Sequence, residues 1–458
     1  MSLSILNIKP EDVDNGNKRA KYSVCIVGCG QTGIIHACLF AEAGFNVICT
    51  DRDQALINNV SKGKGQFLSH HFEVTLRNCI RKGTIKVVND VGVAVSGSQI
   101  IIITTSVKIS EKRKIDYSEL EKTCKQIGSN LKQGSLVIVA SPLGVGFTEK
   151  VVKEIMESIS GFKIGVNIGL AYSPLLIVHE EIERALNQKR VVAASEKASL
   201  NAASVILGTV MKGNLIKTEN IKAAETAILF DIARSEIDNA LINEFASFCE
   251  KTGVDYIETQ RFTKHSSLSE ILTSRFLDEN SHKFLYTLSE DAENVNLKLR
   301  LIEFIKDANE ETVKHIVNLV KDALRSCDKP LRRARISILG ISQIPNAKTP
   351  PKMLAKEVAN MLEARGAKIS IYDPFLSCTE LANMQFQCNK TLTQATEGMD
   401  CLLILTGHDN FKRLNLKKTG AMMKKIPSIV DIEGAVDPYT VEREGFIYRG
   451  FGRGVWTK

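Results

Sequence analysis

The stretch Lys21–Asp53, KYSVCIVGCGQTGIIHACLFAEAGFNVICTDRD, decides the fold of this chain. An apolar, β-branched run from Tyr22 to Val27 leads into a glycine-rich turn, which is followed by an amphipathic segment and a second apolar run, Val47–Thr50. This order predicts a strand, a tight turn, a helix and a second strand, with the pattern G-x-G-x-x-G at the turn. The stretch therefore indicates a Rossmann-like fold that binds a dinucleotide.

Each glycine of the turn has its own physical role. Gly28 permits the tight turn, Gly30 lets the pyrophosphate of a dinucleotide approach the backbone, and Gly33 lets the helix pack closely on the strand. Gln31 and Thr32 open that helix, whose free N–H groups and positive end attract phosphate. We therefore expect these five residues to bind the cofactor.

A carboxylate and an arginine follow the second strand. Asp51 is placed to accept hydrogen bonds from the ribose hydroxyls, and its charge repels a 2′-phosphate. NAD is therefore the expected cofactor rather than NADP, although the neighbouring Arg52 is a residue type that binds a 2′-phosphate. The alternative is an inherited turn whose pocket binds nothing.

Strands and helices continue to alternate after this unit, which predicts a parallel sheet with helical crossovers. Ligands bind beyond the carboxyl ends of such strands, so Thr104 and Thr105, at the end of one strand, and Ser141, after another, are expected to face the cofactor crevice. The expected strands are Thr84–Val88, Gln99–Thr105, Ser135–Ala140, Ile164–Tyr172 and Arg190–Ala194, and the expected helix is Tyr117–Leu131.

One long helix is expected in the middle of the chain. From Glu219 to Lys251 the apolar residues recur at helical spacing, with Thr218 as the expected cap at its start and Gly253 at its end. Such a helix is longer than one domain needs. We expect it to join two domains and to form a subunit interface with its surplus apolar surface.

The region after this helix is expected to be helical, because residues 254–339 contain no glycine and a single proline, Pro330. Beyond Pro330 a second α/β unit is expected. The expected helices are Leu268–Leu277, Lys283–Leu288, Leu297–Lys306, Glu310–Arg325 and Pro351–Arg365, and the expected strands are Arg335–Leu339, Lys368–Tyr372, Cys401–Thr406 and Ser428–Asp431.

The predicted fold class is α/β, with two Rossmann-like doubly wound parallel-sheet domains joined by a long central helix and a helical middle domain. We expect a flexible N-terminal segment at 1–20, an NAD-binding Rossmann-like domain at 21–215, a central helical dimerisation domain at 216–329 and a C-terminal Rossmann-like domain at 330–458.

Composition and charge argue against several other classes of protein. The net charge of +8 is modest, and the basic clusters Lys108–Lys114 and Lys329–Arg335 lack the interleaved aromatic residues of a nucleic-acid surface. No apolar stretch reaches the roughly 18 to 20 residues that span a bilayer, and the first twenty residues do not resemble a signal peptide. Neither nucleic acid nor membrane is therefore an expected partner, and the expected location is cytoplasmic.

The cysteines point to the same compartment. Eleven of them are scattered without the spacing of a disulfide framework, which suits a reducing environment. Cysteine and histidine nowhere gather at metal-ligand spacing, so no metal site is expected.

Several moderately specific motifs occur in order between about Tyr22 and Gly454. They are the GCGQTG turn with Asp51, Ala171–Pro174 (AYSP), Ala224–Glu225, Asn239–Phe245 (NALINEF), Cys249–Asp255 (CEKTGVD), Tyr372–Pro374 (YDP), Leu405–Phe411 (LTGHDNF), Gly445–Phe446 and Gly450–Gly454 (GFGRG). In this order they resemble the UDP-glucose/GDP-mannose dehydrogenase family, the NAD-dependent nucleotide-sugar 6-dehydrogenases of polysaccharide biosynthesis. The resemblance implies that the C-terminal domain binds a UDP- or GDP-linked sugar.

The resemblance also implies reactive residues, and here the chain departs from the family. The family oxidises an alcohol to an acid in two hydride transfers, the second through a cysteine in a glycine-rich loop after the long helix. This chain has no cysteine between Cys249 and Cys327 and no glycine between Gly253 and Gly340. We therefore expect both the thiol and its loop to be absent.

Other functional positions of the family are replaced as well. Ile228 and Ile232 stand where the family has a lysine and an asparagine, and Leu175 stands where it has a glutamate. The lysine and arginine that grip the nucleotide sugar lack clear counterparts in Gln343–Pro350, where Lys348 is a partial substitute. We therefore assign no catalytic residue and expect an eroded active site.

Two residues near the start of the missing loop are candidates for a rebuilt site. His265 is a candidate base if it is buried near the cofactor, and Lys264 precedes it. The alternative is that both are solvated in the polar stretch TKHSS.

Three hypotheses follow. The first is an NAD-dependent oxidoreductase of this family that acts on the CH–OH group of a UDP- or GDP-sugar with an eroded site. The second is a non-catalytic relative that binds NAD or a nucleotide sugar and partners or regulates an intact paralogue, as a homodimer or a hetero-oligomer through the long helix. The third, another Rossmann dehydrogenase such as a 3-hydroxyacid enzyme, is disfavoured by the second α/β unit.

Overall fold

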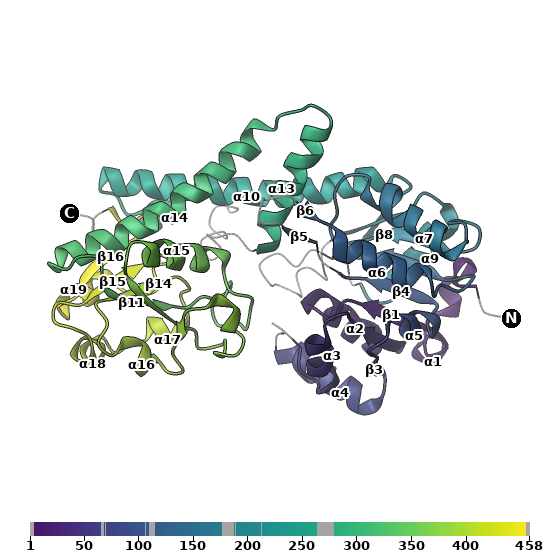
Figure 1. Cartoon of the computed structure of the whole chain (residues 1–458), viewed down its shortest axis with the longest axis horizontal. Coiled ribbons are helices and arrows are strands. Elements are labelled where there is room, and N and C mark those ends of the chain that lie inside the picture. Colours follow the sequence, from purple (N-terminus) through teal and green to yellow (C-terminus); the bar gives the residue numbers. More distant parts are fainter. Residues whose placement is uncertain are drawn as a thin grey trace. The chain divides into compact units, whose positions relative to one another are not determined.

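The computed structural model describes residues 4–65, 68, 70–105, 107–109, 115–175, 187, 189–211, 213–262 and 279–454 (Figure 1). The chain divides into two compact units. The first contains Met1–Ile232 and Lys283–Lys298, and the second contains Ala233–His282 and Leu299–Lys458. Each unit is built on its own sheet, as the α/β prediction requires.

Within the described residues, the first unit contains an eight-stranded sheet in the order β10-β9-β8-β7-β4-β1-β2-β3. Its strands pair in parallel, except that β8 and β9 meet in antiparallel fashion at Tyr172 and Ala193. Helices cover both faces, so the central strands are buried apolar runs. The strands are β1 Ser23–Val27, β2 Asn46–Thr50, β3 Ile85–Val87, β4 Ile100–Ile103, β7 Leu136–Val139, β8 Gly169–Tyr172, β9 Arg190–Ala193 and β10 Leu215–Thr218.

The helix α2, Gln31–Glu42, connects β1 to β2 and buries Ile34, Ile35 and Phe40 in the main core of this unit. A short antiparallel pair, β5 Lys108–Ile109 and β6 Ile115–Asp116, stands apart from the sheet. The other described helices of this part are α3 Gln54–Ser61, α4 His70–Lys82, α5 Val91–Ser96, α6 Ser118–Gly128, the π-helical turn η3 Thr148–Val152, α7 Lys153–Ser160, α9 Lys197–Gly208 and α13 Glu279–Asn294.

The N-terminal segment differs from the prediction of a flexible stretch at 1–20. It forms the turns η1 Ile5–Asn7 and η2 Pro10–Asp12 and the short helix α1 Gly16–Arg19. Ile5 and Val13 are buried in the same core as α2, and the Ile5 N–H donates to the carbonyl of Gly134 at 3.0 Å. The few apolar side chains of a mostly polar segment are enough to anchor it.

Within the described residues, the second unit contains a six-stranded parallel sheet in the order β13-β12-β11-β14-β15-β16. Its strands are β11 Arg335–Leu339, β12 Lys368–Tyr372, β13 Gln387–Cys388, β14 Cys401–Ile404, β15 Ser428–Asp431 and β16 Ile447–Gly450. Its helices are α11 Tyr256–Gln260, α14 Arg300–Ser326, α15 Met353–Ala364, η5 Ala382–Met384, α16 Leu392–Thr396, α17 Asp409–Lys412, α18 Leu416–Met422 and α19 Pro438–Arg443.

The structure corrects one prediction in the helical region and does not describe the residues of another. The helices expected at Leu297–Lys306 and Glu310–Arg325 are one helix, α14, because no glycine or proline interrupts the chain between them. The expected helix at Leu268–Leu277 lies outside the described residues.

The long helix is confirmed as α10, Ile221–Thr252, and it runs from the first unit into the second (Figure 1). Gly253 follows it with a φ of +74°, as expected for a glycine after a helix. Thr218 is not the cap, because it ends β10. The Asn220 side chain instead accepts a hydrogen bond from the N–H of Ala223 at 2.9 Å.

No helix among the described residues has the length and apolarity needed to cross a membrane. The same part of the chain contains no group of three or more His, Cys, Asp and Glu side chains arranged to hold a metal ion.

Candidate cofactor-binding site

The glycine turn between β1 and α2 has the geometry that the motif predicts. Gly28 has a φ of +116°, and a Cβ there would lie 2.6 Å from the Thr104 hydroxyl. A Cβ on Gly33 would lie 1.8 Å from the carbonyl oxygen of Gly28. A Cβ on Gly30 would meet nothing within 4 Å. Gly28 and Gly33 are therefore required by packing, whereas the space beside Gly30 is open to a ligand.

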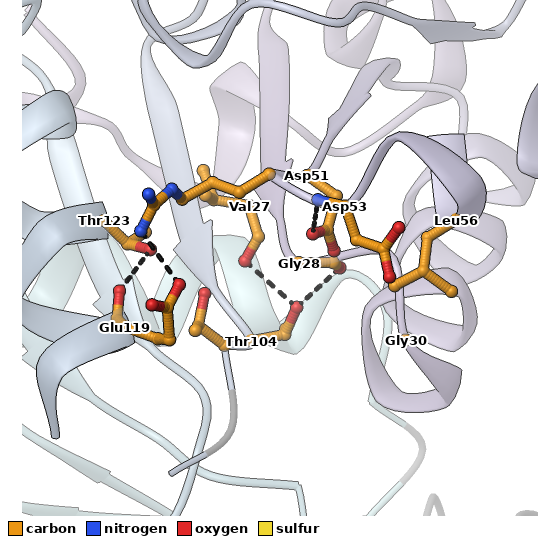
Figure 2. Close-up of a pocket in the computed structure, with 11 residues that line it drawn as sticks. Val27, Gly28, Gly30, Asp51, Asp53, Leu56, Thr104, Glu119 and Thr123 are labelled. Atoms are coloured by element: carbon orange, nitrogen blue, oxygen red, sulfur yellow. Dashed lines mark hydrogen bonds and ion pairs between the residues drawn. The ribbon is translucent and has the colours of Figure 1, made fainter. Parts of the chain in front are cut away.

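A cavity of about 410 Å³ lies beside this turn, at the carboxyl ends of β1, β2 and β4 (Figure 2). This is the edge at which open α/β sheets bind nucleotides. The residues that line it are Val27, Gly28, Gly30, Asp51, Arg52, Asp53, Leu56, Thr104, Thr105, Glu119 and Thr123.

Asp51 ties the second strand to the glycine turn. Its Oδ2 accepts a hydrogen bond from the N–H of Cys29 at 2.6 Å, and its Oδ1 accepts one from the N–H of Asp53 at 2.9 Å. Each carboxylate oxygen has a further lone pair, so Asp51 can still accept hydrogen bonds from ribose hydroxyls at the cavity wall.

The far side of the cavity comes from the first turns of α6. Glu119 accepts an ion-paired hydrogen bond from the Arg52 guanidinium at 2.9 Å, and its carbonyl oxygen accepts one from the Thr123 hydroxyl at 2.8 Å. Figure 2 shows Glu119 and Thr123 on the side of the cavity opposite Leu56. No local motif marks these two residues, because they reach the cavity only through the packing of α6 beside the sheet.

Most of the predicted cofactor residues meet at this cavity. Gly28, Gly30, Asp51, Arg52 and Thr105 line it. The remaining predicted residues do not line it: Gln31, Thr32 and Gly33 form the first turn of α2, and Ser141 is buried after β7.

Thr104, expected at the cofactor crevice together with Thr105, also lines the cavity. Its hydroxyl donates to the carbonyl of Gly28 at 2.8 Å and so holds the turn against the end of β4. A polar side chain directly after the all-isoleucine strand was the available signal for this role.

A buried histidine and arginine support α2 from behind. The His36 Nδ1 lies 2.8 Å from the carbonyl oxygen of Thr32, and its Nε2 lies 3.2 Å from Nη2 of Arg190. Because the guanidinium can only donate, His36 must accept at Nε2 and carry its proton at Nδ1. Burial, followed by the nearby Arg190 charge, lowers the pKa of His36 to about 3. His36 is therefore neutral at physiological pH.

A carboxylate from the long helix holds the loop after β7. Glu225 is fully buried and accepts hydrogen bonds from the N–H groups of Gly146 at 2.5 Å and Thr148 at 2.9 Å. Burial raises its pKa above the ordinary value. Asp291 of α13 accepts a further hydrogen bond from the N–H of Val145 at 2.8 Å. Both carboxylates serve the backbone of this loop.

The positions at which the family resemblance implies reactive side chains are aliphatic and buried. Ile228 is 9%, Ile232 4% and Leu175 5% exposed. None of these side chains can bind a proton, stabilise an alkoxide or orient a water molecule. Lys264 and His265, the candidates for a rebuilt site, lie outside the described residues.

All eleven cysteines fall within the described residues, so their states can be compared. Nine are free thiols, and all nine are buried. Burial raises the pKa of the Cys124 and Cys401 thiols to about 12 and also raises the pKa of Cys249 and Cys327. A raised pKa disfavours the thiolate, which is the nucleophilic form.

The two remaining cysteines correct the expectation of a uniformly reduced set. Cys378 and Cys388 are partly exposed and form a disulfide beside the edge strand β13. Two isolated cysteines ten residues apart give no framework pattern, so the sequence offered no reason to pair them.

In the second unit, the YDP and LTGHD motifs meet after β12 and β14. Asp373 accepts hydrogen bonds from the N–H groups of Ile341 and Ser342, each at 2.9 Å. His408 lies 3.3 Å from Asp373 and 3.0 Å from the Ser342 hydroxyl, in both cases through Nε2. Its Nδ1 accepts from the N–H of Asn346 at 2.9 Å, so Nε2 carries the proton and cannot activate the serine. The cluster is structural.

Lys348, the expected partial substitute for the lost sugar-binding cations, is already ion-paired. Its Nζ lies 2.9 Å from Glu380. Burial alone would raise the pKa of the Glu380 carboxyl, but hydrogen bonds from Ser377 and the contact with Lys348 lower it below the ordinary value. The ammonium group has three N–H donors, so the pair with Glu380 does not by itself prevent contact with a phosphate.

Comparisons with known proteins agree with this geometry. Two models of the UDP-glucose/GDP-mannose dehydrogenase family match the chain: the NAD binding domain at residues 22–210 and the UDP binding domain at residues 337–438. UDP-N-acetyl-D-mannosamine dehydrogenase of Pyrococcus horikoshii is 26% identical over 440 residues, which cover 94% of this chain and 99% of the relative. UDP-glucose 6-dehydrogenase TuaD of Bacillus subtilis is 25% identical over 450 residues, which cover 94% of this chain and 93% of the relative.

Solved structures show the same fold. The structure of a UDP-D-ManNAc dehydrogenase from Pyrococcus horikoshii has a TM-score of 0.82 at 24% identity and covers 94% of this chain and 100% of its own. The structure of a UDP-glucose dehydrogenase from Pyrobaculum islandicum has a TM-score of 0.78 at 18% identity and covers 94% of this chain and 98% of its own.

The fold and the cavity together define an NAD-binding protein of the Rossmann type. More particularly, the chain belongs to the UDP-glucose/GDP-mannose dehydrogenase family.

Proposed function

We propose that this protein is an NAD-dependent oxidoreductase acting on the CH–OH group of a UDP- or GDP-sugar, with an eroded active site that does not complete the four-electron oxidation implied by the family resemblance. One observation carries this proposal. The cofactor cavity is retained, while all nine free thiols of the chain are buried. A thiohemiacetal needs an accessible thiolate, and no cysteine here offers one.

The chemistry left to such a protein is a single two-electron step. Bound NAD would supply the oxidising power for the transfer of one hydride from the carbinol carbon, and the hydroxyl proton would pass to solvent. The product is a carbonyl compound, and without a thiol adduct it is not carried on to the acid by the family route.

We further propose that the cofactor site has the composition expected from the sequence. Gly28, Gly30, Gln31, Thr32 and Gly33 would bind the pyrophosphate at the start of α2. The open space beside Gly30 supports this assignment. Asp51 would bind the ribose, with Arg52 and Thr105 on the cavity wall. Ser141, buried after β7, remains the last member of the proposed set. We propose these residues for cofactor binding only and propose no catalytic residue.

The proposed second ligand is a nucleotide sugar bound by the C-terminal domain, at residues 330–458. The match of this region to the family's UDP binding domain supports the proposal. Relatives named as UDP-glucose or UDP-N-acetyl-D-mannosamine dehydrogenases suggest a UDP-linked substrate. We retain 21–215 as the proposed cofactor domain, 216–329 as the central domain, and the cytoplasm as the proposed location.

A second candidate function is a non-catalytic relative that binds NAD or a nucleotide sugar and partners an intact paralogue. The buried aliphatic side chains of Ile228, Ile232 and Leu175 favour it, because they supply no acid, base or cation. This candidate predicts the same NAD binding with no product.

We also propose that the long helix α10 mediates self-association. Leu241, Phe245 and Phe248 follow one another at helical spacing and remain 39%, 44% and 67% exposed, and Phe230 is 58% exposed. Large apolar side chains exposed along one face of a helix favour an interface over solvent. The alternative partner is a paralogue with the same helix.

Light scattering after size exclusion tests the association. Phe248→Asp should weaken it by about a hundredfold or more, because it puts a charge into an apolar contact. Val166→Asp, at a residue that is 76% exposed in the first unit, is the matched control and should leave the mass unchanged. A Phe248→Asp protein with the wild-type mass would contradict the proposed interface.

One screen separates the functional candidates. Thermal stability is measured with NAD, NADP and a panel of UDP- and GDP-sugars, and NADH formation is followed with the same panel. NAD at 100 times its dissociation constant should stabilise the protein by about 2.7 kcal/mol. Stabilisation with NADH formation supports the oxidoreductase, stabilisation without it supports the non-catalytic relative, and no response to NAD contradicts both.

A further inference from the structure

The two residues that end the second strand make opposite demands on the cofactor. Asp51 disfavours a 2′-phosphate, while an arginine at the next position is a residue type that accommodates one. Sequence alone leaves this conflict open. The structure resolves where the Arg52 side chain goes, because its guanidinium is held by Glu119 at 2.9 Å.

Glu119 is itself held in place at the wall of the cofactor cavity. It lies in the first turn of α6, and its second carboxylate oxygen is 3.1 Å from the Nζ of Lys122. The hydroxyl of Thr123 binds its carbonyl oxygen. One carboxylate therefore pairs with two cations, of which Arg52 lies on the wall of the cavity.

We infer that Glu119 is a specificity-determining residue that excludes NADP by sequestering Arg52. The inference rests on the assignment of this cavity to NAD, as proposed above. Two physical effects act together. The ion pair with Glu119 holds the Arg52 guanidinium, which would otherwise bind a 2′-phosphate through two parallel hydrogen bonds. Glu119 also joins Asp51 and Asp53 as a third carboxylate on the wall, against a single arginine.

The strength of this effect is limited by solvent. The Arg52 and Glu119 side chains are 37% and 35% exposed, so the ion pair is partly screened. Breaking it should therefore free Arg52 at little cost to folding. The expected change lies in the ratio of the two cofactor affinities rather than in stability.

Charge-neutralising variants of the full-length protein test the inference. Glu119→Gln keeps the shape of the side chain and removes its charge. Glu121→Gln removes the same charge from the same turn of α6, at a residue outside the cavity wall, and is the matched control. Dissociation constants for NAD and NADP are measured by isothermal titration calorimetry for the wild type, both variants and the double variant Glu119→Gln, Arg52→Gln.

Glu119→Gln should raise the NADP affinity relative to the NAD affinity by about tenfold, which corresponds to one new charge-assisted interaction with the phosphate. The Glu121→Gln ratio should equal that of the wild type. The double variant should lose the gain, and higher salt should reduce it.

Two results would overturn the inference: a Glu119→Gln ratio no different from that of Glu121→Gln, or a gain that survives removal of Arg52. Either result with normal NAD binding by the wild type would refute only the role of Glu119. Failure of the wild type to bind NAD would instead refute the assignment of the cavity and the inference with it.

Discussion

The cofactor cavity and the buried positions Ile228, Ile232 and Leu175 belong to the same unit, yet they offer a ligand opposite surfaces. The cavity presents open backbone at Gly30 and carboxylates at its wall. The other three positions present only aliphatic carbon, at 9% exposure or less. Binding of a dinucleotide depends on backbone geometry and a helix end, whereas chemistry depends on a few polar side chains. Substitution can therefore remove the chemistry and leave the cofactor site intact.

The largest expected effect concerns the thiols. At pH 8 Cys124 and Cys401 should react with iodoacetamide about a thousandfold more slowly than in an unfolded control, because burial raises their pKa to about 12 and reduces the thiolate. Mass spectrometry of the labelled protein measures this. A reductant should expose Cys378 and Cys388 alone. A rapidly labelled thiol that NAD protects would contradict the contrast between the two regions.

Substitutions at the buried aliphatic positions Ile228, Ile232 and Leu175 should lower the free energy of unfolding without changing the affinity for NAD. Ile232→Ala removes a side chain that is 4% exposed and should lower the free energy of unfolding by about 3 kcal/mol, with an unchanged affinity for NAD. Urea unfolding and NAD titration measure the two quantities. Asp231→Ala, at the exposed neighbour on α10, should change stability by less than about 0.5 kcal/mol. A stable Ile232→Ala protein that no longer binds NAD would place this position in the site instead.

Two glycines of the turn should separate binding from folding. Gly30→Ala meets no atom within 4 Å and keeps an ordinary φ of −69°, so it should fold normally while its methyl group weakens NAD binding by about a hundredfold. Gly33→Ala places a Cβ 1.8 Å from the Gly28 oxygen and should lower the melting temperature as well. Thermal unfolding and NAD titration distinguish the two. Full NAD affinity in Gly30→Ala would mean that the pyrophosphate lies elsewhere.

The smallest expected effect is a pH dependence of the free energy of unfolding, caused by the buried His36 of α2. The folded pKa of His36 is about 3, whereas an unfolded histidine has its ordinary pKa near 6.5. Below pH 6.5 the unfolded chain therefore binds a proton that the folded chain does not, and stability falls as the pH falls. The loss should reach about 2 kcal/mol at pH 5.

The matched pair for this effect is His36→Gln and His71→Gln. The first should lose this pH dependence, because the amide does not titrate, and the second, at an exposed histidine of α4, should keep it. Urea unfolding at pH 7 and pH 5 measures the difference. An unchanged pH dependence in His36→Gln would show that another group is responsible.

Local patterns predicted the fold well. The run from Tyr22 to Thr50 fixed β1, α2 and β2 because apolar periodicity and glycine placement act over short distances. The errors have equally physical causes. The helix α14 continues through the gap between two expected helices, because no glycine or proline interrupts it. Residues 5–19 are anchored by a few apolar side chains in the core of the first unit.

Local spacing predicted the cofactor-site residues next to the motif, and the position of a strand end predicted Thr105. Gly28, Gly30 and Asp51 follow from their spacing, but Glu119 reaches the cavity through the tertiary packing of α6. Ser141 follows the strand β7 of the same sheet, but its side chain is buried and does not line the cavity. Strand order and side-chain direction decide such cases, and neither is written in a local pattern.

We propose that the cofactor half is intact while the thiol-dependent step is lost. The most direct measurement is the amount of NADH formed for each molecule of nucleotide sugar consumed, with saturating NAD, for every UDP- and GDP-sugar that binds. We expect at most one NADH per sugar and no uronic acid product. Two NADH per sugar, with the acid as product, would contradict the claim.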